Sequence, residues 1–398
     1  MTRAPEPPAG AEIGSRRLFP NLESAAYLSF AGISPTSTAV RDASHAVLDE
    51  FARKGLPAFG EQVEVADAAR ASFAKLIGCR AEDLACQPNT SQGVITVARG
   101  LSFRAGDRVL VFRGEFPTNV IPWLAVARDL GLEVVTVDLA DFERSTAEGL
   151  EKVQSELARG VALVAVSAVQ FHTGLCMPLD ELGALCRRHD TLLFVDAVQA
   201  VGATPIDVRR SGIHFLACGS HKWLNGPLGA GFLYVAPEVA DRVEPKLAGW
   251  MSLEEPLAFL FPGGPPVPFD EPLGRAPRAL ETGVLNLPGF GGLCAATEIL
   301  RKLGPAQIHA HVNRYLDILE DAALALGYTS ARSTDPAARS TILALRPPER
   351  RTLGEVADAL NARRITVSAP GGWLRFAPHW PNPLAEADEV AAALAEIG

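Results

Sequence analysis

Between residues 84 and 235, short apolar runs alternate with longer segments in which apolar residues recur at helical spacing. Such runs are typical of strands buried on both faces, and the segments between them are long enough for crossover helices. The alternation predicts an α/β fold in which helices cover both faces of a mostly parallel, seven-stranded sheet. The expected strands are 84–87, 108–112, 133–137, 161–167, 192–195, 214–217 and 231–235. The expected helices are 90–100, 117–130, 148–159 and 178–189.

Helices are also expected before the sheet, and a smaller α+β unit is expected after it. Residues 40–77 have helical apolar spacing, and Gly55, Pro57 and Gly60 divide them into two helices. The pattern of the smaller unit predicts helices near 288–303, 305–326 and 352–362, a strand at 341–345 and short strands around 365–376.

The chain is expected to divide into three segments. Residues 1–20 read as a flexible leader, because prolines and glutamates stand where a signal peptide has its apolar core. Residues 21–265 form the large domain, and residues 266–398 form a loop and the small C-terminal domain. The stretch 261–278 holds six prolines and three glycines, which predicts either a lid over the active site or an inter-domain linker.

Composition limits the class of protein. The chain has 398 residues, of which 48% are hydrophobic, and a formal net charge of −9. An acidic chain without a basic run has no general attraction for nucleic acid or an anionic membrane. Its longest apolar stretch, 161–169, is far shorter than the roughly 20 residues of a membrane span. We therefore expect a cytoplasmic globular protein with no nucleic-acid or membrane partner. The histidines and cysteines lack metal-ligand spacing, so no metal is expected.

Two side chains near the middle of the chain suggest chemistry. The strand at 192–195 stops at Asp196, and open α/β sheets bind ligands where their strands end. Lys222 lies in a glycine-rich turn between two later strands. A lysine in such a turn can form a Schiff base, and a buried aspartate can keep the pyridine nitrogen of pyridoxal 5′-phosphate (PLP) protonated. Either residue alone is more readily a solvated lysine or a helix cap, but the combination favours a PLP site.

The segment from His214 to Leu233 resembles the lysine-attachment signature of the class V aminotransferase family of PLP-dependent enzymes, which includes cysteine desulfurases, kynureninases and isopenicillin N epimerase. His214 stands where the family usually has aspartate, and the stretch from Asp196 to Gln199 resembles its Asp-x-x-Gln. The matching positions of the signature are Gly219, Ser220, His221, Lys222, Gly229 and Gly231. Matching blocks extend from about residue 27 to residue 397. The resemblance implies fold type I, PLP as cofactor, and a homodimer with sites at the subunit interface.

The resemblance also implies roles for polar and aromatic residues that follow the strands. Thr90 and Ser91 match the phosphate cradle, although these residue types also cap helices without any ligand. Phe116 matches the aromatic residue that stacks on the cofactor ring, as in kynureninase-like members. Gln170, with a register uncertain by one residue, and Gln199 are candidates to lie near the phenolic oxygen of PLP.

Further residues are implied near the phosphate and the substrate. Ser220 stands next to Gly219, which lacks a hydroxyl that the family often has, and His221 is expected to contact the phosphate. Val284 replaces a threonine that in the family reaches the neighbouring subunit's phosphate. Arg375 matches the arginine that holds the substrate carboxylate, for which a guanidinium offers two parallel hydrogen bonds. An amino-acid substrate is therefore expected.

The reaction expected is transamination of an α-amino acid through an aldimine on Lys222, with Asp196 and Arg375 as the other catalytic residues. The segment 363–376 contains no cysteine, whereas group II cysteine desulfurases carry their active-site cysteine there. The alternatives are a PLP-dependent C–S lyase, a kynureninase-like hydrolase and an amino-acid epimerase. A cofactor-binding protein without turnover is the least favoured reading, because Lys222, Asp196 and Arg375 are all present.

Overall fold

A central sheet organises the computed structural model, which describes residues 10–260, 263–267, 269–270 and 272–397. The sheet has seven strands in the order β2-β8-β7-β6-β5-β3-β4. Only β8 runs antiparallel to its neighbours, and the other adjacent pairs are parallel. The strands are β2 (Leu84–Gln87), β3 (Arg108–Arg113), β4 (Glu133–Asp138), β5 (Leu163–Ser167), β6 (Leu192–Asp196), β7 (Phe215–Gly219) and β8 (Gly231–Val235). The predicted mostly parallel seven-stranded sheet is confirmed, and each strand lies where it was expected.

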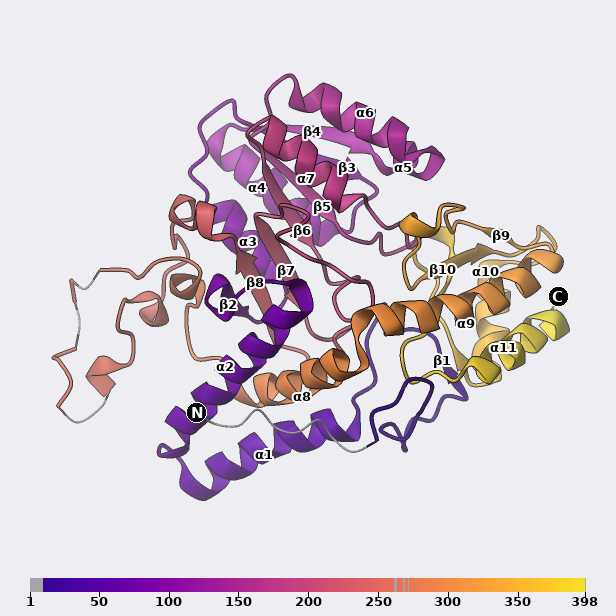
Figure 1. Cartoon of the computed structure of the whole chain (residues 1–398), viewed down its shortest axis with the longest axis horizontal. Coiled ribbons are helices and arrows are strands. Elements are labelled where there is room, and N and C mark those ends of the chain that lie inside the picture. The colour runs from indigo at the N-terminus through magenta and orange to yellow at the C-terminus, as the bar shows by residue number, and fades with distance from the viewer. Residues whose placement is uncertain (1–9, 261–262, 268, 271, 398) are drawn as a thin grey trace.

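Helices cover both faces of this sheet, as Figure 1 shows. Every residue of β5, β6, β7 and β8 is buried, which explains why these strands are apolar without alternation. Helices α3 and α4 pack together on one face, and α6 and α7 pack together on the other. The helices are α3 (Thr90–Gly100), α4 (Ile121–Leu130), α5 (Leu139–Arg144), α6 (Thr146–Leu157) and α7 (Leu179–Arg188).

Three further helices pack together below the sheet: α1 (Thr38–Lys54), α2 (Ala58–Ile77) and α8 (Leu287–Leu303). Gly55 ends α1 with a positive φ of 61°, and Pro57 precedes the first turn of α2. Gly60 was expected to help separate the helices, but it lies within α2. Helix α8 was assigned to the C-terminal segment 266–398, yet it packs on α1 and α2, and its Phe290 contacts Phe232 of β8.

A three-stranded antiparallel sheet and three helices form the smaller unit, an arrangement that agrees with the predicted α+β pattern. Its sheet consists of β9 (Thr329–Ser330), β10 (Leu343–Arg346) and β12 (Leu374–Phe376). Its helices are α9 (Pro305–Ala325), α10 (Leu353–Ala362) and α11 (Leu384–Ile397). Helix α11 was not predicted, because its alanine-rich sequence has a weak apolar stripe.

The N-terminal segment joins this smaller unit. Strand β1 (Ala26–Tyr27) pairs in parallel with β11 (Ile365–Thr366). The Gly14 amide donates to the Trp380 carbonyl at 2.7 Å, and Leu18 and Phe19 are buried. Residues 10–20 are therefore packed against the C-terminal part of the chain, and the prediction of a flexible leader is wrong for them.

After β8 the chain leaves the body of the protein beyond the β2 edge of the sheet (Figure 1). A bridge between Leu253 and Leu273 closes the base of this excursion, and the Gly274 amide donates to the Ser252 carbonyl at 2.9 Å. Residues 261–262, 268 and 271 of the predicted lid lie outside the described residues. Among the described residues, no helix is long and apolar enough to cross a membrane.

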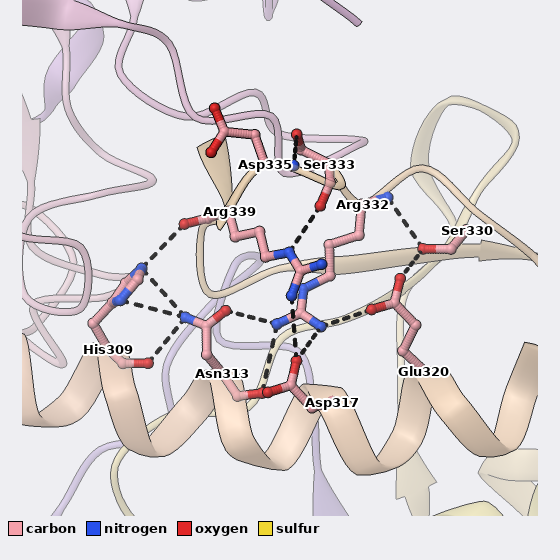
Figure 2. Close-up of polar contacts among 9 residues, drawn as sticks. All are labelled: His309, Asn313, Asp317, Glu320, Ser330, Arg332, Ser333, Asp335 and Arg339. Carbon is pink, nitrogen blue, oxygen red and sulfur yellow. Dashed lines mark hydrogen bonds and ion pairs between the residues drawn. The ribbon is translucent and has the colours of Figure 1, made fainter. Parts of the chain in front are cut away.

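A buried arginine fixes the loop after β9 to helix α9, as Figure 2 shows. The Arg332 side chain is 2% exposed, and its Nη1 lies 2.7 Å from both Asp317 Oδ1 and Glu320 Oε2. Its Nη2 donates to Asn313 Oδ1 at 2.7 Å. A buried guanidinium is tolerated only when such partners replace its water. The cluster thus ties the start of the small-domain sheet to the helix that supports it.

We predict that Arg332→Ala lowers the free energy of unfolding by about 3 kcal/mol, because it leaves the largely buried carboxylate of Glu320 without its cation, whereas Asp317 is half exposed and keeps Arg339 at 3.7 Å. Arg314→Ala is the matched control, since Arg314 lies exposed on the same helix and its loss should change stability by less than about 0.5 kcal/mol. Urea denaturation measures both variants. Equal stability of the two would contradict the account of this cluster.

Candidate functional site

A cavity of about 420 Å³ lies where β5, β6 and β7 end and α3 begins. The carboxyl ends of parallel strands are the usual ligand-binding edge of an open α/β sheet. The small domain contributes one wall through Arg375 on β12. Of the predicted site residues, those that line the cavity are Thr90, Ser91, Phe116, Asp196, Gln199, His221, Lys222 and Arg375.

Lys222 is placed by the turn between β7 and β8. The Asn225 amide donates to the Lys222 carbonyl at 3.0 Å, and Asn225 itself has a φ of 53°, which closes the turn tightly. Trp223 is fully buried beneath the turn, where its carbonyl contacts His379 Nε2 at 2.8 Å. The lysine amine therefore points into the cavity from a rigid base.

Burial governs the charge of the Lys222 amine. Loss of solvent lowers the pKa of Lys222, and Arg375 lowers it further, while Asp196 acts in the opposite direction. Within the described parts of the chain, no carboxylate lies within ion-pair distance of its Nζ. A lysine with a lowered pKa spends more of its time as the neutral amine, which is the nucleophilic form.

Asp196 ends β6 and is 3% exposed. Its Oδ1 accepts the Val198 amide at 3.0 Å, which fixes the carboxylate at the floor of the cavity. Burial raises the pKa of Asp196 to about 6, although the Val198 amide and Lys222 both favour the ionised form. A buried carboxylate without a bonded cation is suited to pair with a cationic group of a ligand.

The first turn of α3 forms another wall. Asn89 caps the helix by accepting the Gln92 amide at 2.8 Å, and the preceding backbone N–H groups of Thr90 and Ser91 remain available to a ligand. Thr90 Oγ1 accepts the Gly219 amide at 2.9 Å, and Ser91 Oγ lies 2.9 Å from Thr118 Oγ1. Free N–H groups with hydroxyls at a helix start are a suitable cradle for a phosphate.

Phe116 covers the cavity opposite Asp196. Its ring centroid lies 5.6 Å from Lys222 Nζ and 5.2 Å from the ring of Phe171. Although it lines the cavity, Phe116 remains 42% exposed, so one side of the ring is open to a ligand or to another chain. An aromatic ring in this place can stack on a planar ligand.

Three of the predicted glutamine and serine residues do not offer free polar groups to the cavity. Gln199 lines it, but its amide bonds the Ala31 carbonyl at 3.0 Å and Trp223 Nε1 at 2.8 Å. Gln170 does not line the cavity, whereas its neighbour Val169 does. Ser220 is fully buried and bonds the Pro227 carbonyl. Gln170 lies in the loop after β5, which ends at Ser167, and its neighbours Val169 and Phe171 are the residues of this loop that line the cavity.

Arg375 is held in place by uncharged partners. Its Nε donates to Ser368 Oγ at 3.1 Å, and its Nη1 donates to the Phe171 carbonyl at 2.5 Å. Burial without an acidic partner lowers the pKa of Arg375 to about 10. The guanidinium therefore still has N–H groups for an anion, and a carboxylate entering the cavity would remove the cost of its burial.

Several residues around the cavity were not identified from the sequence. Thr118 and Ser167 line it, and Glu115 is buried directly behind Ser167. Serine, threonine and glutamate are common on surfaces, so only the fold reveals their placement. His172 does not line the cavity, and its ring lies 4.8 Å from that of Phe171. None of the described residues of the predicted lid lines the cavity, and the lid remains a prediction.

The described residues contain no cluster of histidine, cysteine, aspartate or glutamate that could hold a metal ion. No cysteine lines the cavity. The nearest thiol, Cys218 on β7, is buried, and its pKa is raised mainly by that burial and also by Asp196. The chemistry of the cavity therefore rests on amine, carboxylate, imidazole, guanidinium and hydroxyl groups.

A model of the family Aminotransferase class-V matches residues 27–373. The chain belongs to the class V aminotransferase family. The resemblance identified from the Lys222 segment is thereby confirmed, and the match covers most of the chain.

Relatives within the class V family carry different activities in their names. An uncharacterized aminotransferase, YcbU of Bacillus subtilis, is 28% identical over 95% of this chain and 96% of its own length. A probable cysteine desulfurase of Methanothermobacter thermautotrophicus is 30% identical over 74% of this chain and 72% of its own. The isopenicillin N epimerase of Streptomyces clavuligerus is 29% identical over 82% of this chain and 83% of its own length.

A solved structure has the same fold: a lysine-to-alanine variant of C-DES with glycine covalently linked to its PLP cofactor. It matches with a TM-score of 0.86 and 22% identity, and the match covers 96% of this chain and all of that one. PLP is the cofactor of this class V enzyme. The cavity fits that group, because it combines an unpaired buried amine, a buried carboxylate and a helix start with free N–H groups.

Proposed function

We propose that this class V enzyme transaminates an α-amino acid, with Lys222 as the residue that holds PLP and moves the proton. The observation that carries the proposal is the buried amine of Lys222 in a cavity shared with Asp196 and Arg375. PLP, when bound, draws electrons away from the α-carbon of an amino acid joined to it. The protein's task is to hold both groups and to supply a base at that carbon.

Each wall of the cavity suits one part of the cofactor. Thr90 and Ser91 with the N–H groups of α3 would hold the phosphate, and His221 beside them would add a further contact. Asp196 would pair with the ring nitrogen and Phe116 would cover the ring. Three predicted residues would support these groups rather than contact the cofactor, because their polar atoms bond other protein groups. They are Gln199, Gln170 and Ser220.

Arg375 is suited to the substrate carboxylate. It lies on the small-domain wall, its charge is unpaired, and its guanidinium can make two parallel hydrogen bonds. Lys222 Nζ could take a proton from the α-carbon of a substrate fixed in this way and deliver it, on the same face, to the cofactor carbon that takes over the amino group. Transamination needs only one base on one face, whereas epimerisation also needs a proton donor on the other face.

Cysteine desulfuration through a protein thiol is disfavoured by the same cavity. Such an enzyme needs a reactive thiolate that reaches the substrate sulfur. Cys218 is buried with a raised pKa and does not line the cavity, and neither does any other described cysteine. A second candidate is C–S bond cleavage by a PLP lyase, the activity in the name of C-DES, a cystine C–S lyase with the same fold. The lack of a cysteine among the described residues that line the cavity favours a form of that reaction without a protein thiol.

A homodimer is part of the proposal. Phe116, which lines the cavity, is 42% exposed, and the large apolar side chains of Ile33, Ile121, Leu228 and Val284 are 55%, 58%, 64% and 65% exposed. Exposed apolar side chains become buried when they form an interface. We expect sedimentation equilibrium to give twice the 42.2 kDa mass of one chain, and a monomer at micromolar concentration would contradict this part. The cytoplasmic location remains a prediction from the sequence.

The reaction is tested by supplying the PLP-loaded protein with single L-amino acids, including cysteine and cystine, and measuring the products. Transamination predicts one keto acid per cofactor without an acceptor, and continuous turnover once a second keto acid is added. Ammonia with pyruvate and a sulfur product would support the lyase instead. Full turnover by Lys222→Ala would contradict both readings.

The role of Arg375 is tested by Arg375→Ala. Because one hydrogen bond to a charged group contributes about 1.5–3 kcal/mol, kcat/KM should fall by at least about tenfold, with the loss mainly in KM. Arg363→Ala is the matched control, an exposed arginine of the same domain that should leave both constants unchanged. An amine substrate without a carboxylate should be equally poor for the wild type and for Arg375→Ala.

A further inference from the structure

Glu115 is a buried carboxyl group that the proposed mechanism does not use. It follows β3, is 8% exposed, and lies behind the cavity wall. Its Oε1 accepts the Ser167 amide at 2.6 Å and Gln170 Nε2 at 3.1 Å. Its Oε2 makes a short contact with Ser167 Oγ. Both carboxyl oxygens are thus directed at the end of β5.

The charges around Glu115 favour its neutral form. Among the described residues, no lysine, arginine or histidine is bonded to it, and the charged group that acts on it is another acid, Asp196 of β6. Burial raises the pKa of Glu115 to about 7, and Asp196 adds to the rise, although Ser167 and Gln170 oppose it. Two carboxyl groups buried in one region do not readily ionise together, so one of them retains a proton.

Asp196 is the carboxyl that loses its proton more readily, because the charged form of Lys222 and the Val198 amide both favour its ionised form. Lys222 lowers the pKa of Asp196, and the Val198 amide donates to its Oδ1. Glu115 has hydrogen bonds but no cation. The two acids are therefore distinguished by their surroundings, with the proton on Glu115 and the negative charge on Asp196.

Ser167 connects Glu115 to the cavity. It lines the cavity, and in the parallel register of β5 and β6 it is the direct partner of Asp196. If Glu115 is neutral, its Oε2–H donates to Ser167 Oγ, and the serine proton is free to donate into the cavity. If Glu115 is ionised, the serine proton turns toward Glu115, and the cavity meets only the lone pairs of Ser167.

We propose that Glu115 is a positioning residue that retains a proton, keeps the Ser167 hydroxyl directed into the cavity as a donor, and leaves Asp196 as the ionised acid. The inference deepens the proposed function, because the cavity is the one that would hold PLP. The state of Glu115 itself does not depend on that function. It can therefore be measured without the cofactor.

The first experiment is infrared difference spectroscopy of the PLP-free protein between pH 5 and pH 9. The wild type should show the band of a protonated carboxyl group that disappears as the pH rises through about 7, and Glu115→Gln should lack this band. Glutamine copies the neutral acid, since its oxygen can accept both N–H groups and its NH₂ can donate to Ser167. Identical bands in the two proteins at low pH would overturn the proposal.

A second readout follows the sign of the linkage. A carboxyl whose folded pKa is raised stabilises the protein at low pH, and this contribution is lost as the pH rises through about 7. Glu115→Gln should therefore equal the wild type in thermal stability at pH 5 and exceed it at pH 9. A Glu115→Gln variant that is less stable than the wild type at both pH values would overturn the neutral assignment.

The connection through Ser167 is tested with the PLP-loaded protein. The absorbance of the bound cofactor should change with a midpoint near pH 7 in the wild type, and this change should be absent in Glu115→Gln and in Ser167→Ala. Ser167→Ala should keep the infrared band of Glu115. An unchanged midpoint in both variants would overturn the connection.

Glu386→Gln is the matched control. Glu386 is also a buried acid whose pKa is raised by burial, but it lies on α11, bonded to Asn382 and Tyr315 away from the cavity. The cofactor spectrum of this variant should keep the wild-type midpoint. If neither the wild type nor any variant binds PLP, the proposed function fails, whereas the infrared result still decides the state of Glu115.

Discussion

Burial of the Lys222 amine against the Asp196 carboxylate is the constraint on which the site depends. Asp196 ends the fully buried strand β6, and Lys222 lies in the tight turn that follows the fully buried strand β7, so neither can move to solvent without disturbing the sheet. The amine loses its water and becomes a better nucleophile, while the acid keeps a charge that a ligand can compensate. The remaining walls serve this pair: a helix start, an aromatic ring and one arginine.

The cavity is assembled from parts of the chain that are distant in sequence. The N-terminal strand pairs with β11 and so brings Ala31 and Gly32 to the wall. Arg375 reaches the same wall from the small domain and is held there by the Phe171 carbonyl, which belongs to the loop after β5. The geometry of this wall therefore depends on how the two domains sit together. The same loop carries Gln170, which connects it to Glu115.

Local patterns predicted most of the fold, because strands buried on both faces give apolar runs that are easily seen. The Lys222 turn and Asp196 were found for the same reason, since both follow such runs. Gln170 and Ser220 were expected to reach the cofactor, but orientation at a strand end depends on register, which sequence spacing does not determine. Glu115 and Ser167 were missed because their role arises only when β3 and β5 become neighbours. The packing of the N-terminal segment was missed for a similar reason, because it depends on the pairing of β1 with the distant strand β11.

Identifying the lysine that carries PLP tests the central claim most directly. The PLP-loaded protein is reduced with borohydride, which makes a lysine-bound cofactor permanent, and is then digested and analysed by mass spectrometry. The account predicts a phosphopyridoxyl group on Lys222 and on no other lysine. A label on another lysine, or loss of all cofactor after reduction and unfolding, would contradict it.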